Sequence, residues 1–310
     1  MAACASSQRS SDLLPFRSLS LSEIRDDWSL FLRVNDIETE FEDSHLDKER
    51  LLSIAEHFEQ ARPEYVAVAD RFHKEINEFE YVHSVAFRIK KTDSLIRKII
   101  VKSLDGLEDI EPITEDNYQV LITDLVGLRI LYVFKSEYLP VHKQIMKLYQ
   151  DRTTEDIQIN IKAGDDKNFY KGISRSKSTK SKFIENADYR SIHYIIKSAE
   201  KDKCPRVEIQ TRTLFEEAWS EINHKIVYKN SQIAGFDSLS MASRILSSLA
   251  GGCDDLGDYM KVIYDNYTKE IAASINSSSN TSFEPQLYQE DDDLASRVMH
   301  EVLGRLFTYK

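Results

Sequence analysis

An apolar, β-branched run at residues 125–134, LVGLRILYVF, is the feature of this sequence that most constrains its fold. The length and the flanks of this run predict a buried strand. Strand patterns also occur before it, in VHSVAFRIKK, and after it, in DIQINIK, YRSIHYIIK and RVEIQTRT. Helical patterns precede, interrupt and follow these segments. This order predicts an α+β fold, in which a mixed sheet of about four to five strands is flanked by N- and C-terminal helices.

The same patterns divide the chain into four parts. We expect a loose N-terminus at residues 1–20, a helical N-terminal extension at 21–81, a core at 82–230 and a C-terminal helical extension at 231–310. Within the core, residues 163–188 are predicted to form a long polar loop. In the last part, a Ser/Asn-rich linker is predicted to separate long helices at about 238–275 from a final helix that begins with an acidic run.

The composition is typical of a soluble globular protein, with 41% hydrophobic and 30% charged residues in 310. No apolar run approaches the roughly 18 to 20 residues that a membrane helix needs, and no secretory signal is recognisable. The cysteines are scattered at positions 4, 204 and 253, which favours a cytoplasmic location over a disulfide framework or a zinc site. A net charge of −11 argues against a general nucleic-acid binder but allows a local basic site.

Two carboxylates lie next to apolar strand patterns. Asp124 directly precedes the run at 125–134, and Glu208 lies inside RVEIQTRT. A carboxylate beside a buried strand is costly unless it is paired or binds a cation, and two of them on neighbouring strands would suit Mg²⁺. The alternative is that each carboxylate pairs with a nearby arginine, Arg129 or Arg212. The residues alone leave both interpretations open.

Basic residues gather in two segments. In the first, alternation puts Arg88 and Lys90 on one strand face, and Ser94 and Lys98 share one face of the helix that follows. Cations beside a helix N-terminus suit a polyphosphate. The second segment, residues 171–182, carries five basic residues and no acidic one. Solvated surface charge is the alternative interpretation of both segments.

Tyr189 and His193 are four residues apart in a strand pattern and therefore face the same way, with Ser191 between them. A tyrosine ring can stack on a nucleobase, and a histidine can bind a phosphate or a ribose. Packing of a half-buried tyrosine and histidine within the sheet explains the same pattern.

The order and spacing of all the motifs together identify a family more specifically than any single motif does. Five motifs together resemble the synthetase domain of the RelA/SpoT family. They are R-x-K-x-x-x-S-x-x-x-K from Arg88, D-L-V-G-L-R-I from Asp124, Y-R-S-I-H from Tyr189, V-E-I-Q-T-R-T around Glu208 and W-S-E-I-N-H-K from Trp219. The resemblance covers about half of the chain. It implies a nucleotidyltransferase-like core that transfers pyrophosphate from ATP to the 3′ hydroxyl of GDP or GTP and so makes the alarmones ppGpp and pppGpp.

The resemblance also implies roles at the metal and at ATP. Asp124 and Glu208 match the carboxylates that hold Mg²⁺, and Glu208 also matches the base for the 3′ hydroxyl. Arg88 and Arg129 match the arginines that stack on the adenine of ATP. The residues that match groups gripping the ATP phosphates are Lys90, Ser94 and Lys98.

For the acceptor nucleotide, the resemblance implies that Tyr189 stacks on the guanine, with His193 as its neighbour in the pocket. Lys182 belongs to the loop that contacts the acceptor phosphates. Gln210 and Arg212 have supporting roles, and His224 matches the histidine of the helix after that strand.

The sequence departs from the family pattern in ways that leave the acceptor open. The segment K-S-K-F-I-E-N-A-D-Y lacks the Pro-Lys and the Gly that usually precede the tyrosine, and Asn223 stands where many members have Glu. No hydrolase signature is recognisable, so we expect a small, synthesis-only member. The alternatives are a toxin-like relative that modifies the tRNA 3′ end or adenosine nucleotides, with an antitoxin as partner, and an inactive nucleotide-sensing module. The helical extensions are expected either to mediate a homo-oligomer, as in small members of the family, or to cover the sheet.

Overall fold

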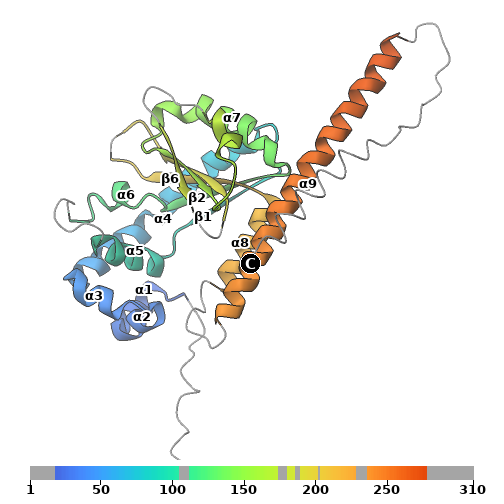
Figure 1. Cartoon of the computed structure of the whole chain (residues 1–310). Helices are drawn as coiled ribbons and strands as arrows, with labels where there is room; N and C mark the ends of the chain where they lie inside the picture. Colours follow the sequence, from blue (N-terminus) through green and yellow to red (C-terminus); the bar gives the residue numbers. More distant parts are fainter. Residues whose placement is uncertain are drawn as a thin grey trace, which may run out of the picture. The chain divides into compact units, whose positions relative to one another are not determined.

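The computed structural model describes residues 18–104, 112–173, 180–185, 189–201, 203–227 and 236–277. Its helices, labelled in Figure 1, are α1 (Leu21–Asp26), α2 (Trp28–Asn35), α3 (Glu38–Ser44), α4 (Lys48–Asn77), α5 (Thr92–Leu104), α6 (Tyr118–Leu121), α7 (Tyr138–Tyr149), α8 (Leu214–Ile226) and α9 (Phe236–Ser277), with short 3₁₀ turns η1 (Lys135–Glu137), η2 (Gln150–Arg152) and η3 (Lys167–Gly172). The strands are β1 (Ser84–Ile89), β2 (Val126–Tyr132), β3 (Ile157–Ile161), β4 (Ser181–Glu185), β5 (Ser191–Lys197) and β6 (Arg206–Thr213).

The strands form one mixed sheet in the order β1-β2-β6-β5-β3-β4. This confirms the predicted α+β class with helices before and after the strands, but the sheet has six strands rather than four to five. The additional strand, β4, lies in the segment 163–188 that we predicted to be a loop, and η3 lies there too. β4 pairs in parallel with β3, so that Ser181 lies opposite Ile157. Its short sequence SKFIE becomes a strand because β3 supplies the hydrogen-bonding partner.

Contacts between residues divide the chain into two compact units. Unit 1 comprises Met1–Arg71, Phe87–Gly127 and Lys197–Glu208, and unit 2 comprises Phe72–Ala86, Leu128–Ile196 and Ile209–Lys310. The final helix predicted after the Ser/Asn-rich linker lies outside the described residues.

In unit 1, helix α4 buries one face. Leu51, Ala55, Phe58 and Tyr65 recur at three- and four-residue spacing or its multiples and are at most 1% exposed. Tyr65 donates to or accepts from the hydroxyl of Tyr118 at 2.7 Å, so the polar end of this buried ring is satisfied. Helices α1 and α3 pack against α5 in the same unit.

In unit 2, α7 buries Val141, Ile145 and Tyr149, which are four residues apart. Strand β5 buries residues on both of its faces, as its pattern of buried positions shows. Helix α8 follows β6 directly and begins at the cap of Thr213, whose side chain accepts from the amide of Glu216 at 3.1 Å. Helix α9 packs along α8, as Figure 1 shows.

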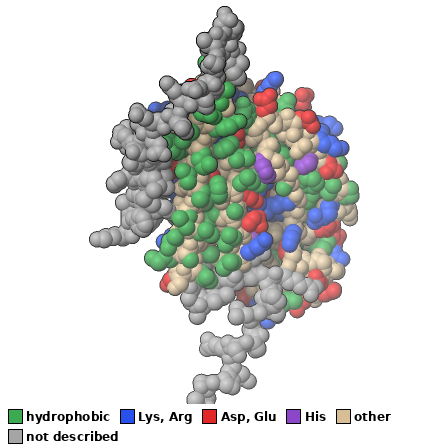
Figure 2. All heavy atoms as spheres, turned by 90° about the vertical axis from the view of Figure 1, so that its right-hand side faces the viewer, with side chains coloured by type: hydrophobic (Ala, Val, Ile, Leu, Met, Phe, Trp, Pro, Cys, Tyr) green, Lys and Arg blue, Asp and Glu red, His purple; other side chains and the backbone are tan. Residues whose placement is uncertain are grey.

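Large apolar side chains remain exposed on α8 and α9, among them Phe215, Ile245, Met260 and Tyr264. Figure 2 shows apolar side chains gathered over a wide part of the face that it displays. Although α9 is long, no helix in the described part of the chain has a stretch apolar enough to span a membrane.

Candidate active site

Asp124 and two lysines form a charged cluster in unit 1, which we call the Asp124 cluster. Lys90 Nζ lies 2.6 Å from Asp124 Oδ2, and Lys98 Nζ lies 2.7 Å from Asp124 Oδ1. Lys90 follows β1, Asp124 precedes β2, and the two strand ends are joined because the Lys90 amide donates to the Leu125 carbonyl at 2.9 Å. Lys98 comes from α5. Two ammonium groups therefore share one carboxylate.

The charges of this cluster perturb one another. Burial raises the pKa of Asp124, but Lys90 and Lys98 outweigh it and hold that pKa below its usual value. Burial, together with the charges of Lys98 and Arg88, lowers the pKa of Lys90 against the opposing effect of Asp124. Asp124 is therefore ionised at neutral pH, and it is not paired with Arg129, as one interpretation of the sequence allowed.

Ser94 and Arg88 lie close to this cluster in the sequence and belong to the same unit. The Ser94 amide, in the first turn of α5, lies 2.6 Å from Asp93 Oδ1. Arg88 is exposed at the end of β1, and a Cβ at Gly127 would lie 3.4 Å from its Cγ. The stem of this arginine therefore passes alongside Gly127. Glu208 is half-buried on β6.

A second site in unit 2 is a cavity of about 200 Å³, which we call the Tyr189 cavity. It is lined by Tyr189, His193, Gln210, Arg212, Trp219, Ser220, Asn223 and His224. Five of the six residues predicted for the acceptor nucleotide therefore come together here. The sixth, Lys182, is exposed on β4 and does not line this cavity. Arg129, predicted at the adenine, pairs in the structure with Glu217 and Glu221 of α8.

Tyr189 and His193 form one wall of the cavity. Their ring centroids are 6.3 Å apart and the rings are inclined by 27°, so they are close to parallel. His193 Nε2 lies 2.7 Å from Ser191 Oγ. Burial, together with the charge of Arg212, lowers the pKa of His193 to about 3. His193 is therefore neutral at physiological pH and acts there as a hydrogen-bonding and stacking group.

Arg212 is the central polar group of the cavity and is only 6% exposed. Its Nη1 donates to Ser220 Oγ and its Nη2 donates to Gln210 Oε1, both at 2.7 Å. Burial and the neighbouring charge of Arg129 lower the pKa of Arg212, although Glu217 opposes them. The guanidinium is thus fixed between β6 and α8, facing groups that accept from it.

The sequence argument did not identify Ser220 as part of the site. Trp219, Ser220, Asn223 and His224 lie at helical spacings of one, four and five residues, so they share one face of α8. Helical periodicity within W-S-E-I-N-H-K was the signal that could have found this residue.

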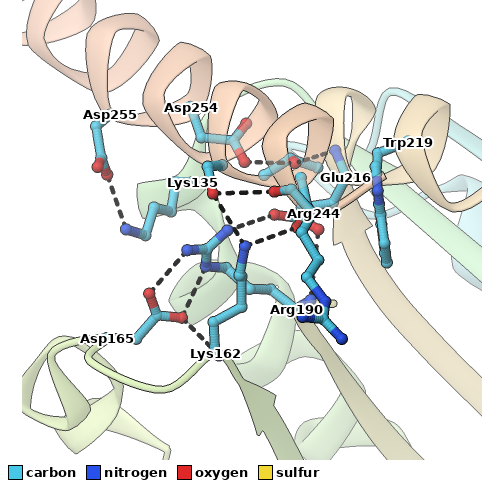
Figure 3. Close-up of polar contacts among 12 residues, drawn as sticks. Lys135, Lys162, Asp165, Arg190, Glu216, Trp219, Arg244, Asp254 and Asp255 are labelled. Carbon is cyan, nitrogen blue, oxygen red and sulfur yellow. Dashed lines mark hydrogen bonds and ion pairs between the residues drawn. The ribbon is translucent and has the colours of Figure 1, made fainter. Parts of the chain in front are cut away.

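An ionic network, shown in Figure 3, is centred on Arg190, the residue that follows Tyr189. This network was not predicted from the sequence either. Arg190 donates to both oxygens of Asp165, from Nε at 2.7 Å and Nη2 at 2.8 Å, and from Nη1 to Glu216 Oε1 at 2.8 Å. A Cβ at Gly251 would lie 2.6 Å from Arg190 Nη1, so α9 approaches the guanidinium through a glycine. The network connects the start of β5 with α8 and α9.

Two further contacts connect α9 to this region. Lys162 Nζ lies 3.2 Å from Ser247 Oγ, and the Thr213 hydroxyl donates to Asp254 Oδ2 at 2.8 Å. Burial raises the pKa of Asp254 to about 7, against the hydrogen bond from Thr213. Within the described residues, no group of three or more His, Cys, Asp or Glu side chains is placed to hold a metal ion by itself.

Comparison with known proteins finds one matching family model. Residues 87–233, slightly less than half of the chain, match the family described as "Region found in RelA / SpoT proteins". This part of the chain is similar to the RelA/SpoT region. This region includes Arg88, the Asp124 cluster and the lining residues of the Tyr189 cavity, and it supports the prediction of a pyrophosphokinase. Helix α9 lies beyond it.

Among curated protein sequences, none matches this chain significantly. Solved structures are similar at low identity. Small alarmone synthetase 1 from Bacillus subtilis has a TM-score of 0.44 and 18% identity, over 68% of this chain and 97% of that one. The protein smu.1046c from Streptococcus mutans UA159 has a TM-score of 0.41 and 20% identity, over 69% and 95%. A GTP pyrophosphokinase family protein from Streptococcus pneumoniae has a TM-score of 0.39 and 17% identity, over 83% and 98%.

Proposed function

We propose that this protein transfers pyrophosphate from ATP to the 3′ hydroxyl of GDP or GTP in the cytoplasm. The observation that carries the proposal is the agreement of two sites with the RelA/SpoT region. In one site, two lysines hold a partly buried, ionised carboxylate. In the other site, five residues that the resemblance assigns to the acceptor surround one cavity.

The Asp124 cluster suits the phosphates of ATP. Pyrophosphoryl transfer depends mainly on positioning and on neutralising phosphate charge. Lys90 and Lys98 now share Asp124, and incoming phosphate oxygens would offer both lysines further anionic partners. Ser94, in the first turn of α5, would add a hydrogen bond where a helix N-terminus favours negative charge. We assign Arg88 and Arg129 to the adenine.

The residues present fit Mg²⁺. Asp124 is an ionised hard-oxygen ligand, and Glu208 is the second carboxylate of the same unit. Mg²⁺ is commonly bound by one or two carboxylates and keeps water and substrate phosphates as its other ligands. When bound, the ion would neutralise charge on the phosphate oxygens.

The chemistry then needs a base and an aligned acceptor. The acceptor 3′ oxygen forms a bond to the β phosphorus of ATP, the bond from that phosphorus to the oxygen bridging to the α phosphate breaks, and AMP leaves. Glu208 takes the proton of the 3′ hydroxyl. Tyr189 stacks on the base of the acceptor, and the neutral His193 supports the tyrosine ring.

The proposal is tested with Mg²⁺ and γ-labelled ATP, offering GDP, GTP, ATP or bulk tRNA as acceptor. We expect label in a 3′-pyrophosphorylated guanosine nucleotide, and its loss in Asp124→Asn and in Glu208→Gln. Asp151→Asn, an exposed acid on η2, is the matched control and keeps full activity. Label only in tRNA or adenosine nucleotides would overturn the proposed guanosine acceptor. No transfer to any of the four acceptors would overturn the proposal that the protein is a pyrophosphokinase.

A further inference from the structure

The Tyr189 cavity is lined by polar groups, two of which turn their acceptor oxygens toward Arg212. Gln210 Oε1 and Ser220 Oγ both accept from Arg212, at 2.7 Å each. A guanidinium has five donors and no acceptor. These contacts therefore occupy acceptor oxygens on this side of the cavity, and Arg212 itself offers a ligand only hydrogen-bond donors.

Asn223 continues this pattern through a contact with α9. Its Oδ1 lies 2.7 Å from Ser243 Oγ, and Ser243 Oγ also lies 3.2 Å from Trp219 Nε1. An indole N–H can only donate, so the serine oxygen accepts from Trp219 and its own proton goes to Asn223 Oδ1. The amide nitrogen of Asn223, with two N–H donors, is the end of the side chain left for a ligand in the cavity.

Stacking does not choose between purines, because every base offers a π face to Tyr189. Hydrogen bonds do choose. Guanine has an acceptor at O6, whereas adenine has the N6 amino donor at the same position. An N–H facing O6 makes a hydrogen bond, whereas an N–H facing N6 leaves two donors opposed and unpaired.

We propose that Asn223, oriented by Ser243, determines which base the acceptor site takes by donating to the O6 carbonyl of a 6-oxopurine. This inference rests on the proposed function of the Tyr189 cavity as the acceptor site. It makes Ser243 of α9, which lies beyond the RelA/SpoT region, a positioning residue for base selection. A hydrogen bond of this kind is worth roughly tenfold to a hundredfold in discrimination between bases.

The test measures equilibrium binding of GDP, IDP and ADP, with the ATP site saturated by a non-hydrolysable ATP analogue. Transfer rates to the same three acceptors are measured alongside. IDP keeps O6 and lacks the 2-amino group of guanine, so it isolates the contact to O6. We expect the unmodified protein to bind GDP and IDP at least about tenfold more tightly than ADP.

Asn223→Asp replaces the amide donor with a carboxylate acceptor. We expect GDP and IDP binding to weaken about tenfold or more while ADP binding holds or improves. Ser243→Ala removes the hydroxyl that orients the amide, and we expect it to reduce the GDP-to-ADP preference several-fold. Asn266→Asp, which adds the same charge at an exposed position of α9, leaves the preference unchanged.

Three results would overturn the inference: IDP bound as weakly as ADP, a GDP-to-ADP ratio unchanged in both Asn223→Asp and Ser243→Ala, or no purine nucleotide bound. If Asn223→Asp lowers Tm so far that binding cannot be measured, Ser243→Ala decides alone. A shifted binding ratio without pyrophosphate transfer would refute the proposed function and leave the inference standing. Normal pyrophosphate transfer with an unchanged GDP-to-ADP binding ratio would refute the inference and leave the proposed function standing.

Discussion

The Asp124 cluster and the Tyr189 cavity use buried polar groups in opposite ways. In the Asp124 cluster, two cations face one anion, so the net charge is positive and a polyphosphate would be attracted. In the Tyr189 cavity, His193 is neutral and Arg212 is bound to neutral oxygens of Gln210 and Ser220, with Glu217 further away at 3.3 Å. One arrangement suits charge, and the other suits the shape and hydrogen-bonding pattern of a base. This difference predicts that changes in each region have separable effects.

The largest effect should follow from Asp124→Asn. The change removes a carboxylate assigned to Mg²⁺ and leaves Lys90 and Lys98 without their anion. We expect kcat/KM to fall about 10²- to 10⁴-fold. Binding of GDP in the Tyr189 cavity, measured separately, should stay within about twofold of the unmodified protein. A comparable loss of GDP binding would show that the two regions do not act separately.

The next effect concerns the stability of the region where α9 packs on α8. In the folded state burial raises the pKa of Asp254 from 3.8 to about 7, so the folded protein holds a proton that the unfolded chain has lost. The free energy of unfolding therefore falls as pH rises from about 4 to about 7, by up to about 4 kcal/mol. Glu216, Lys135 and Arg190 are the charged groups that face it.

Asp254→Asn should remove most of this slope, since the amide stays neutral and can still accept from Thr213. Denaturant unfolding at several pH values between 4 and 8 measures the slope. Asp255→Asn, which changes the neighbouring acid paired with Lys135, should retain it. An unchanged slope in Asp254→Asn would mean that this carboxyl ionises freely in the folded state.

A smaller effect is expected at Tyr189. Tyr189→Ala removes the ring and should raise KM for the acceptor about 5- to 100-fold, because stacking contributes about 1–3 kcal/mol per base. KM for ATP should not change. Tyr189→Phe keeps the ring and loses the hydroxyl, whose contact to Asn160 is long at 3.3 Å, so it should behave almost as the unmodified protein. Equal effects on both substrates would contradict the division of roles.

The smallest effect is expected at two glycines of α9. Gly→Ala within a helix normally stabilises it by up to about 1 kcal/mol. Gly257→Ala should follow this rule, because its Cβ would meet only Phe134 Cδ1 at 3.8 Å. Gly251→Ala should instead destabilise by about 1–2 kcal/mol, because its Cβ would press on Arg190, which Asp165 and Glu216 hold in place. If the network in Figure 3 is rigid, thermal unfolding should show a raised Tm for Gly257→Ala and a lowered Tm for Gly251→Ala.

Much of the fold could be predicted from the sequence. The alternating and β-branched segments gave five of the six strands, and the helical patterns before, between and after them gave the flanking helices. Strand β4 could not be predicted, because SKFIE has no strong pattern of its own and is a strand through its pairing with β3. Its stability comes from a tertiary contact.

The candidate site divides in the same way. The alternation of the strand by itself placed Tyr189 and His193 on one face, because periodicity fixes the face on which each side chain lies. The resemblance of the motifs to the RelA/SpoT family then placed these two residues and Arg212 in one proposed pocket. Only the tertiary structure decided that Asp124 pairs with lysines, that Ser243 orients Asn223, and that Gly251 admits Arg190. Those partners are distant in the chain, and three-dimensional packing alone brings them within hydrogen-bonding distance.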